Sequence, residues 1–237
     1  MSIVIGNGMI GNEAKSIWSK YSNHLIYASG VSNSACEDAN EFLKEKNMLQ
    51  ETINKIKSDY YIIYYSTCSI YDSSISKSSK YIQHKLEMES LVRKCKKFYI
   101  FRLPQVVGHT NSDKTLIKYF YNSIQDGRKI QVYKNAFRNL IDVNDVIKLS
   151  EYICGKKEHE NKITNIANPK NISIKSIINI IAEIVNKKPN IEIIDDGSSY
   201  EISNQTVNEI CEKAGVSFDR DYEHKVIKKY YSSRNEN

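Results

Sequence analysis

The sequence predicts an α/β fold in which a parallel sheet is covered by helices on both faces. Two observations predict it. Short β-branched and aromatic runs alternate with longer helical patterns along the first half of the chain, as in successive β-α-β units. Most of these short runs are apolar throughout, which is typical of strands buried on both faces of a sheet. A chain of 237 residues is long enough to bury the core of such a fold.

The first half of the chain is expected to form the core of the sheet. The expected strands are residues 2–5, 24–28, 59–65 and 98–103. A helix is expected to begin near Ile10, and others to cover residues 37–58 and 81–96. The 37–58 helix is amphipathic, with one apolar face made by Phe42, Leu49, Ile53 and Ile56. We therefore assign residues 1–110 to a core domain.

The pattern of expected elements changes after residue 110, and residues 111–237 are assigned to a smaller lobe. This lobe is expected to pack on the core and to return some strands and helices to it. Its expected helices are 116–124, 145–153, 173–185 and 206–213, with Asn144 and Ser173 as candidate N-caps. Its expected extended segments are 129–132, 138–143, 162–166 and 191–194. The basic segment 225–231, with Arg234, is read as a solvated terminus.

Composition limits the classes of function. No apolar run approaches the ~20 residues that span a bilayer, and the first residues lack the basic flank of a signal peptide. We therefore expect a cytoplasmic protein with no membrane partner. The net charge is +6, but the lysines are spread along the whole chain instead of clustering with aromatics, so no nucleic-acid partner is predicted.

The five cysteines are scattered, and none is two residues from another. This spacing predicts free thiols and no metal site. Cys68 lies beside the candidate site described below, so a nucleophilic role stays open for it, although no histidine is evidently placed to activate it.

A glycine turn follows the first expected strand. Gly6-Asn7-Gly8-Met9-Ile10-Gly11 fits the pattern G-x-G-x-x-G and leads into a helix. The first glycine permits a tight turn, the second lets the backbone approach a pyrophosphate, and the third allows close packing of helix on strand. The pyrophosphate would lie on the helix N-terminus. The alternative is a tight turn that binds no ligand.

The stretch from Ser66 to Lys85 carries the candidate chemistry. Ser66 and Thr67 stand where a buried strand ends, and Tyr81 and Lys85 lie four residues apart on one face of the next helix. An ammonium beside a phenol favours the phenolate and lowers its pKa, so these groups form a candidate proton-transfer site.

Taken together, these motifs resemble the short-chain dehydrogenase/reductase superfamily, and most closely its extended NAD-dependent epimerase/dehydratase branch. The resemblance covers nearly the whole chain and implies a Rossmann-like fold. Its motifs are the glycine turn, the small-residue segment Ala28-Ser29-Gly30, the strand end Ser66–Tyr71, the Y-x-x-x-K pair Tyr81/Lys85, the segment Phe101–Gly108 and the late motif Arg138–Val146.

The resemblance implies a role for each matching residue. Tyr81 would be the acid/base, Lys85 would lower its pKa and hold the nicotinamide ribose, and Thr67 would hydrogen-bond the reacting oxygen, with Ser66 as the neighbouring option. NAD or NADP is the implied cofactor and a nucleotide sugar the implied substrate. The implied cofactor-binding residues are Gly6, Gly8, Met9, Ile10, Gly11, Ala28, Gly30, Ser66, Tyr81 and Lys85. The implied substrate-binding residues are Thr67, Gln105 and Arg138.

The sequence also departs from the family pattern. One strand lies between the glycine helix and Ala28, where the family has three, so a core short of its second and third strands is expected. No carboxylate ends the 24–28 strand to bind a ribose. Cys68 and Ser69 stand where sugar 4,6-dehydratases carry an Asp-Glu pair, which argues against dehydration.

We therefore predict an NAD(P)-dependent nucleotide-sugar oxidoreductase, a keto-reductase or an epimerase, of bacterial surface-polysaccharide synthesis. The alternative is a non-catalytic or regulatory protein that has lost firm dinucleotide binding. A nucleotide-sugar enzyme that uses no dinucleotide is a third possibility. The family resemblance further implies a homodimer formed through helices 37–58 and 81–96.

Overall fold

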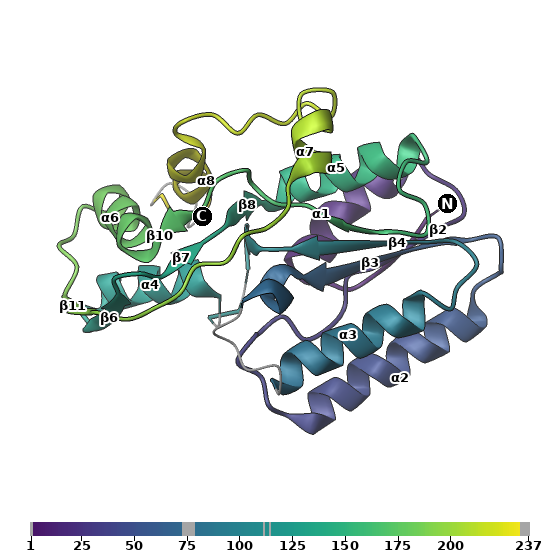
Figure 1. Cartoon of the computed structure of the whole chain (residues 1–237), viewed down its shortest axis with the longest axis horizontal. Coiled ribbons are helices and arrows are strands. Elements are labelled where there is room, and N and C mark those ends of the chain that lie inside the picture. Colours follow the sequence, from purple (N-terminus) through teal and green to yellow (C-terminus); the bar gives the residue numbers. More distant parts are fainter. Residues whose placement is uncertain (1, 73–78, 111, 114, 233–237) are drawn as a thin grey trace.

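The computed structural model describes residues 2–72, 79–110, 112–113 and 115–232. Its main sheet is parallel and has five strands in the order β1-β2-β3-β4-β9, which confirms the predicted fold class (Figure 1). This described sheet does not support the expectation that two strands of the core are missing. Strand β1 lies at one edge. The bounds are β1 (Ile3–Ile5), β2 (His24–Tyr27), β3 (Tyr61–Thr67), β4 (Phe98–Leu103) and β9 (Ile163–Asn165).

Helices cover both faces of this sheet, as Figure 1 shows. On one face α2 (Ala39–Lys55) lies beside α3 (Lys80–Val92), and on the other α1 (Met9–Trp18) packs against α5 (Val143–Gly155). The continuous apolar run of β3 is explained by these two layers. Ile63 and Tyr65 join the core cluster on the α1 and α5 side, whereas Ile62 and Tyr64 join the cluster under α2 and α3.

The other elements form short sheets and helices around a second hydrophobic cluster. Two-stranded sheets pair β5 with β8, β6 with β11 and β7 with β10. The bounds are η1 (Cys68–Tyr71), β5 (Gln105–Val107), α4 (Leu116–Gln125), β6 (Ile130–Tyr133), β7 (Phe137–Arg138), β8 (Leu140–Asp142), β10 (Ile172–Ser173), α6 (Ile174–Val185), β11 (Ile191–Ile194), α7 (Gln205–Ile210) and α8 (Tyr222–Tyr231).

The N-caps of α5 and α6 differ in how well they were predicted. Ser173 caps α6, as expected, because its hydroxyl accepts a hydrogen bond from the amide of Ser176 at 3.0 Å. Asn144 was the wrong choice for α5. Asp142 caps that helix and accepts from the amide of Asn144 at 2.8 Å, because the helix begins two residues earlier than its hydrophobic pattern indicates.

The reading of residues 225–231 as a solvated terminus was also wrong; Arg234 lies outside the described residues. The segment belongs to helix α8, whose Val226 and Ile227 are buried in the second cluster. Two polar contacts anchor the helix. The Tyr222 hydroxyl donates to Asp145 at 2.7 Å, and the Lys229 ammonium lies 2.9 Å from Asp142.

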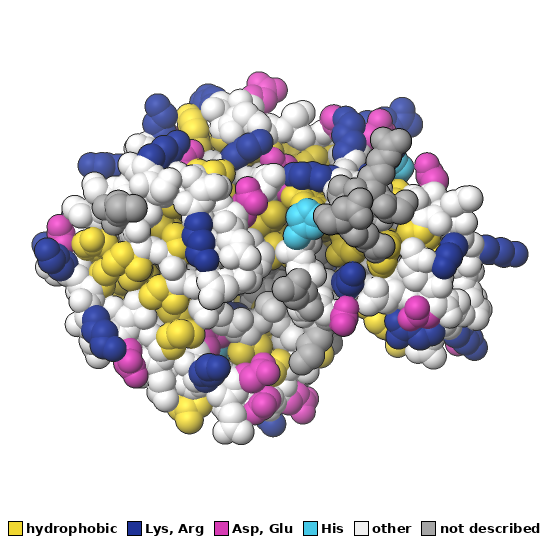
Figure 2. Space-filling model, turned by 180° about the vertical axis from the view of Figure 1, so that it is seen from behind, with side chains coloured by type: hydrophobic (Ala, Val, Ile, Leu, Met, Phe, Trp, Pro, Cys, Tyr) yellow, Lys and Arg dark blue, Asp and Glu magenta, His cyan; other side chains and the backbone are white. Residues whose placement is uncertain are grey.

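Within the described residues, no helix combines the length and apolar character that crossing a membrane requires. On the face presented in Figure 2, lysine and arginine side chains are dispersed among aspartates and glutamates. This dispersion agrees with the even spread of lysines along the sequence.

Candidate active site

A cavity of about 590 Å³ lies at the carboxyl ends of β1 to β4, where ligands bind in open parallel sheets. It brings together eleven of the residues predicted from sequence: Gly8, Met9, Ile10, Ala28, Gly30, Ser66, Thr67, Tyr81, Lys85, Gln105 and Arg138. The two other predicted residues, Gly6 and Gly11, do not line it. The glycine turn and the Tyr81/Lys85 pair thus face one space.

The three glycines of the turn have different tasks. Gly6 has a φ of +123°, and a Cβ there would lie 2.3 Å from the carbonyl oxygen of Ala28. A Cβ on Gly11 would lie 2.4 Å from the carbonyl oxygen of Gly6. These two glycines are therefore needed for the close approach of backbone segments within the protein. Gly8 has open space around it and borders the cavity at the N-terminus of α1, which has no side-chain cap.

The phenol of Tyr81 lies beside the end of β3. Its side chain is buried, and it shares the cavity wall with Thr67. Burial raises the pKa of Tyr81 to about 12, against an opposing hydrogen-bonding interaction with Thr67. This shift is opposite in direction to the lowering predicted from Lys85, whose ammonium is bonded to Glu45 and Tyr64 instead. A phenol that stays protonated at neutral pH is suited to donate a proton.

Ser66 is committed to a different contact. Its hydroxyl donates to Oε1 of Glu89 at 2.6 Å, and the guanidinium of Arg102 holds both oxygens of the same carboxylate at 2.9 and 2.7 Å. Arg102 also donates to the hydroxyl of Tyr71 at 2.9 Å. Thr67 is therefore the better candidate to hold a reacting oxygen, since Ser66 serves this buried network.

Lys85 is paired with a carboxylate that the sequence analysis did not single out. Its ammonium lies 3.0 Å from Oε1 of Glu45 and 3.2 Å from the hydroxyl of Tyr64. Burial lowers the pKa of Lys85, and the charge of Glu45 opposes this shift. The lysine thus reaches the cavity as one member of an ion pair.

Gln105 and Arg138 line another part of the cavity wall. Both side chains are half-buried, and they come from β5 and β7. The guanidinium of Arg138 donates to the carbonyl of Phe137 at 2.7 Å. The charge of Arg138 also reaches Tyr200, whose pKa burial raises to about 12. This part of the cavity therefore offers an amide and a cation to an anionic ligand.

Cys68 does not have the properties of a nucleophile. The side chain is fully buried, and burial raises the pKa of its thiol to about 12. Reactive cysteines instead have a depressed pKa and some exposure. In the described part of the chain, no three His, Cys, Asp or Glu side chains are grouped as a metal site requires.

The cavity residues suit the pyrophosphate of a dinucleotide, whereas the adenosine ribose has no evident ligand among the described residues. Gly8 and the free amides at the start of α1 suit a pyrophosphate, because a helix N-terminus attracts anions. The wall beyond it is formed by Ala28 to Ser34, and Tyr81 and Lys85 line the same cavity. The segment after β2 offers small and polar side chains there, without a carboxylate for the adenosine ribose.

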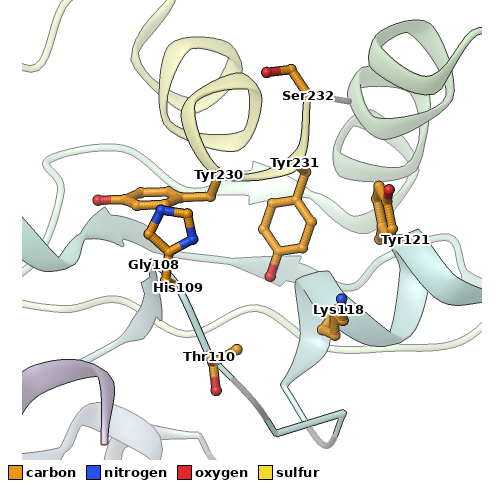
Figure 3. A pocket seen from close by; sticks show the side chains of 8 residues that line it. All are labelled: Gly108, His109, Thr110, Lys118, Tyr121, Tyr230, Tyr231 and Ser232. Carbon is orange, nitrogen blue, oxygen red and sulfur yellow. The ribbon is translucent and has the colours of Figure 1, made fainter. Parts of the chain in front are cut away.

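A smaller cavity of about 130 Å³ lies against α8 and was not predicted (Figure 3). The ring of His109 meets that of Tyr230 edge-on, with centroids 5.0 Å apart, and Lys118 lies across the cavity. Thr110 lines both cavities. The segment after β5 therefore separates two neighbouring spaces.

The fold and the site define a class of protein. A parallel sheet with a glycine turn after its first strand and a Y-x-x-x-K pair at its carboxyl edge is the arrangement of short-chain dehydrogenases/reductases. Residues 22–167, more than half of the chain, match the NAD dependent epimerase/dehydratase family, and the chain belongs to this family. No curated protein matches the sequence.

Solved structures share the fold at low sequence identity. RMD from Pseudomonas aeruginosa complexed with NADPH is similar with a TM-score of 0.73 and 16% identity, over 98% of this chain and 99% of that chain. The UDP-glucose 4-epimerase of Thermus thermophilus, in complex with NAD, has a TM-score of 0.67 and 13% identity over 96% and 83%. The dTDP-glucose 4,6-dehydratase of Bacillus anthracis, also with NAD, has 0.66 and 14% over 97% and 79%.

The open space at Gly8 leads to a prediction. Replacing Gly8 by Ala should leave the free energy of unfolding within about 0.5 kcal/mol of wild type, because among the described residues no atom beyond its two chain neighbours lies within 4 Å of the new Cβ. The methyl group would occupy the approach of a pyrophosphate, so binding of NADPH should weaken by about tenfold. Urea unfolding and NADPH fluorescence titration measure the two effects. Equal binding by both proteins would contradict the assignment of this turn to the cofactor.

Proposed function

We propose that this protein is an NAD(P)-dependent nucleotide-sugar oxidoreductase that reduces a keto group, with epimerisation as the second candidate. The observation that carries the proposal is the cavity shared by the glycine turn, Thr67, Tyr81 and Arg138. Tyr81, protonated at neutral pH, can donate the proton that reduction of a keto group needs. The similar structures that bind NADPH and NAD support the choice of cofactor.

The residues would divide the work as follows. A nicotinamide cofactor, when bound, supplies the hydride that goes to the keto carbon. Tyr81 donates its phenolic proton to the oxygen, Thr67 holds that oxygen by a hydrogen bond, and solvent returns a proton to Tyr81. Lys85 would hold the ribose of the nicotinamide, and α1 would hold the pyrophosphate through its N-terminal amides. Gln105 and Arg138 bind the sugar nucleotide.

The absence of a carboxylic acid and base beside Thr67 argues against dehydration, since Cys68 and Ser69 occupy these positions. We place the enzyme in bacterial surface-polysaccharide synthesis, in the cytoplasm, where nucleotide sugars are the substrates of such enzymes. We further propose a homodimer formed through α2 and α3, which expose Leu43 and Leu86.

The rival proposal is a binding or regulatory protein without turnover. The lack of a carboxylate after β2 motivates it. The test is to mix the purified protein with NADPH or NADH and a panel of nucleotide 4-keto-sugars and to follow absorbance at 340 nm. Oxidation of the reduced cofactor that depends on the sugar supports the oxidoreductase. Calorimetric binding of the nucleotide sugar without any turnover supports the rival.

Arg138 provides a test of the substrate end. Replacing it by Met should raise KM for the nucleotide sugar by about 10- to 100-fold, because a charge-assisted hydrogen bond to a phosphate is worth roughly 1.5–3 kcal/mol. The affinity for NADPH should stay within about twofold, since Arg138 belongs to β7 and not to the glycine turn or the segment after β2. Lys134→Met is the matched control, because this exposed lysine of the same region pairs with Asp195 and does not line the cavity. An unchanged KM in Arg138→Met would remove this residue from the substrate site.

A further inference from the structure

The carboxylate of Glu45 is buried beside the cavity and accepts hydrogen bonds from several directions. It projects from α2 and is 2% exposed. Its donors are the amide of Val31 at 2.8 Å, the hydroxyl of Tyr64 at 3.0 Å, Nε2 of His84 at 2.8 Å and the ammonium of Lys85 at 3.0 Å. These donors come from the segment after β2, from β3 and from α3. One side chain therefore connects three parts of the cavity wall.

The backbone is shaped to admit this carboxylate. A Cβ on Gly30 would lie 2.4 Å from Oε1 of Glu45, so only glycine leaves room for it. The hydroxyl of Tyr27 donates to the main-chain oxygen of Glu45 at 3.2 Å and holds α2 against β2. Gly30 was predicted to bind the cofactor, and it does line the cavity. Its lack of a side chain also leaves room for the carboxylate of Glu45.

The charges around Lys85 show why a carboxylate is needed there. The lysine is 5% exposed, and a buried ammonium without a counter-charge gives up its proton more readily. Glu45 faces it from α2, Tyr64 from β3, and Glu89 acts from α3, the helix that also carries His84. Burial alone would raise the pKa of Glu45, but the hydrogen bond from His84 and the charge of Lys85 outweigh it and bring it to about 2.

We propose that Glu45 is a positioning residue of this site: it fixes the Lys85 ammonium at the Tyr81 end of the cavity and ties it to the Gly30–Val31 segment. An ammonium in this place donates to the hydroxyls of a nicotinamide ribose, whereas a neutral amine binds them less firmly. The ribose part of the inference rests on the proposed function. The state of Lys85 can be measured without any cofactor.

The first experiment measures the protonation of Lys85 in the protein without ligand. The protein is labelled with ¹³C-lysine, the Cε signal of Lys85 is assigned by its loss in Lys85→Met, and the signal is followed against pH. In Glu45→Gln, the ratio of amine to ammonium at a given pH should rise by about tenfold or more relative to wild type. Glu41→Gln, an exposed position one turn earlier on α2, should leave the signal unchanged. A Lys85 signal that titrates alike in wild type and Glu45→Gln would overturn the proposal.

A second measurement covers the case in which Glu45→Gln folds poorly. The variants Glu45→Gln, Lys85→Met and the double variant are compared by urea unfolding, because removing one partner of a buried pair costs more than removing both. The double variant should unfold at a higher urea midpoint than Glu45→Gln alone. If the free energy of unfolding lost by the double variant equals the sum of the losses of the two single variants, the two residues act independently. This result also overturns the proposal.

Cofactor binding separates this inference from the proposed function. NADPH titration followed by fluorescence should show wild-type affinity nearly constant between pH 6 and 8, and an affinity of Glu45→Gln that falls as pH rises. If the wild type binds no dinucleotide, the proposed function fails, while the Lys85 signal still decides whether Glu45 holds the ammonium. If Glu45→Gln binds NADPH as wild type does at every pH, the ribose part of the inference is wrong.

Discussion

Replacement of Tyr81 by Phe is expected to lower turnover by about 10²–10⁴-fold, the usual contribution of a positioned acid or base. The change keeps the ring, which packs with Val31 and Ile82, and removes only the hydroxyl beside Thr67. The fold should therefore persist, with a urea midpoint close to that of wild type. Because burial raises the pKa of Tyr81 to about 12, the wild-type rate of keto reduction should hold through neutral pH and fall only toward strongly alkaline pH.

The matched control is Tyr99→Phe. Tyr99 is a buried tyrosine of β4, and its hydroxyl has no hydrogen-bond partner among the described residues. Removing that hydroxyl should leave turnover unchanged and should not destabilise the protein, because an unpaired buried hydroxyl already costs free energy. Full turnover by Tyr81→Phe, measured as kcat on a keto-sugar that the wild type reduces, would rule out the proposed acid.

A large loss of stability is expected from Arg102→Leu. This guanidinium side chain is 15% exposed and holds both oxygens of Glu89. Without it, Glu89 retains a bond from Ser66 and the charge interaction with Lys85, but has lost the cation that is bonded to it directly. Removing one partner of a buried ion pair costs roughly 3–5 kcal/mol, so the urea midpoint should fall well below that of wild type.

Arg93→Leu serves as the control for the loss of an arginine as such. Arg93 is exposed at the end of α3, so its replacement should change the free energy of unfolding by about 0.5 kcal/mol or less. Similar losses in Arg93→Leu and Arg102→Leu would show that the pair with Glu89 adds nothing to stability.

The parts of the site that could be predicted are those encoded by local spacing. The glycine turn and the Tyr81/Lys85 pair each lie within a few residues, and the periodicity of the chain places them at a strand end and on a helix face. Successive β-α-β units place the carboxyl ends of their parallel strands at the same edge of the sheet, so both motifs are expected there. That edge is where the cavity lies.

Glu45 was not predicted as a site residue because its role depends on partners far away in the chain. Its position in the helix pattern nevertheless indicates burial. It lies three residues after Phe42 and four before Leu49, so it stands on the apolar face of α2. A carboxylate on such a face needs a buried donor. The pattern thus flags Glu45 but cannot name Lys85, forty residues later, as its partner.

Helix α8 was not predicted for a related reason. Its lysines dominate the local composition, whereas its buried face is made by four residues whose packing partners lie elsewhere: Tyr222, Val226, Ile227 and Tyr231. The acceptors Asp142 and Asp145 that hold it come from a segment some 80 residues earlier. Composition alone therefore gave the wrong reading of this segment.

The way α8 is held has a consequence for how the protein is made. The helix leaves the ribosome after β8 and α5, whose Asp142 and Asp145 it contacts. Until then, the second hydrophobic cluster lacks Val226 and Ile227, and the apolar side chains of α6 that pack with them are open to solvent. A nascent chain in this state is prone to aggregate, so folding of this part can be completed only after α8 has emerged.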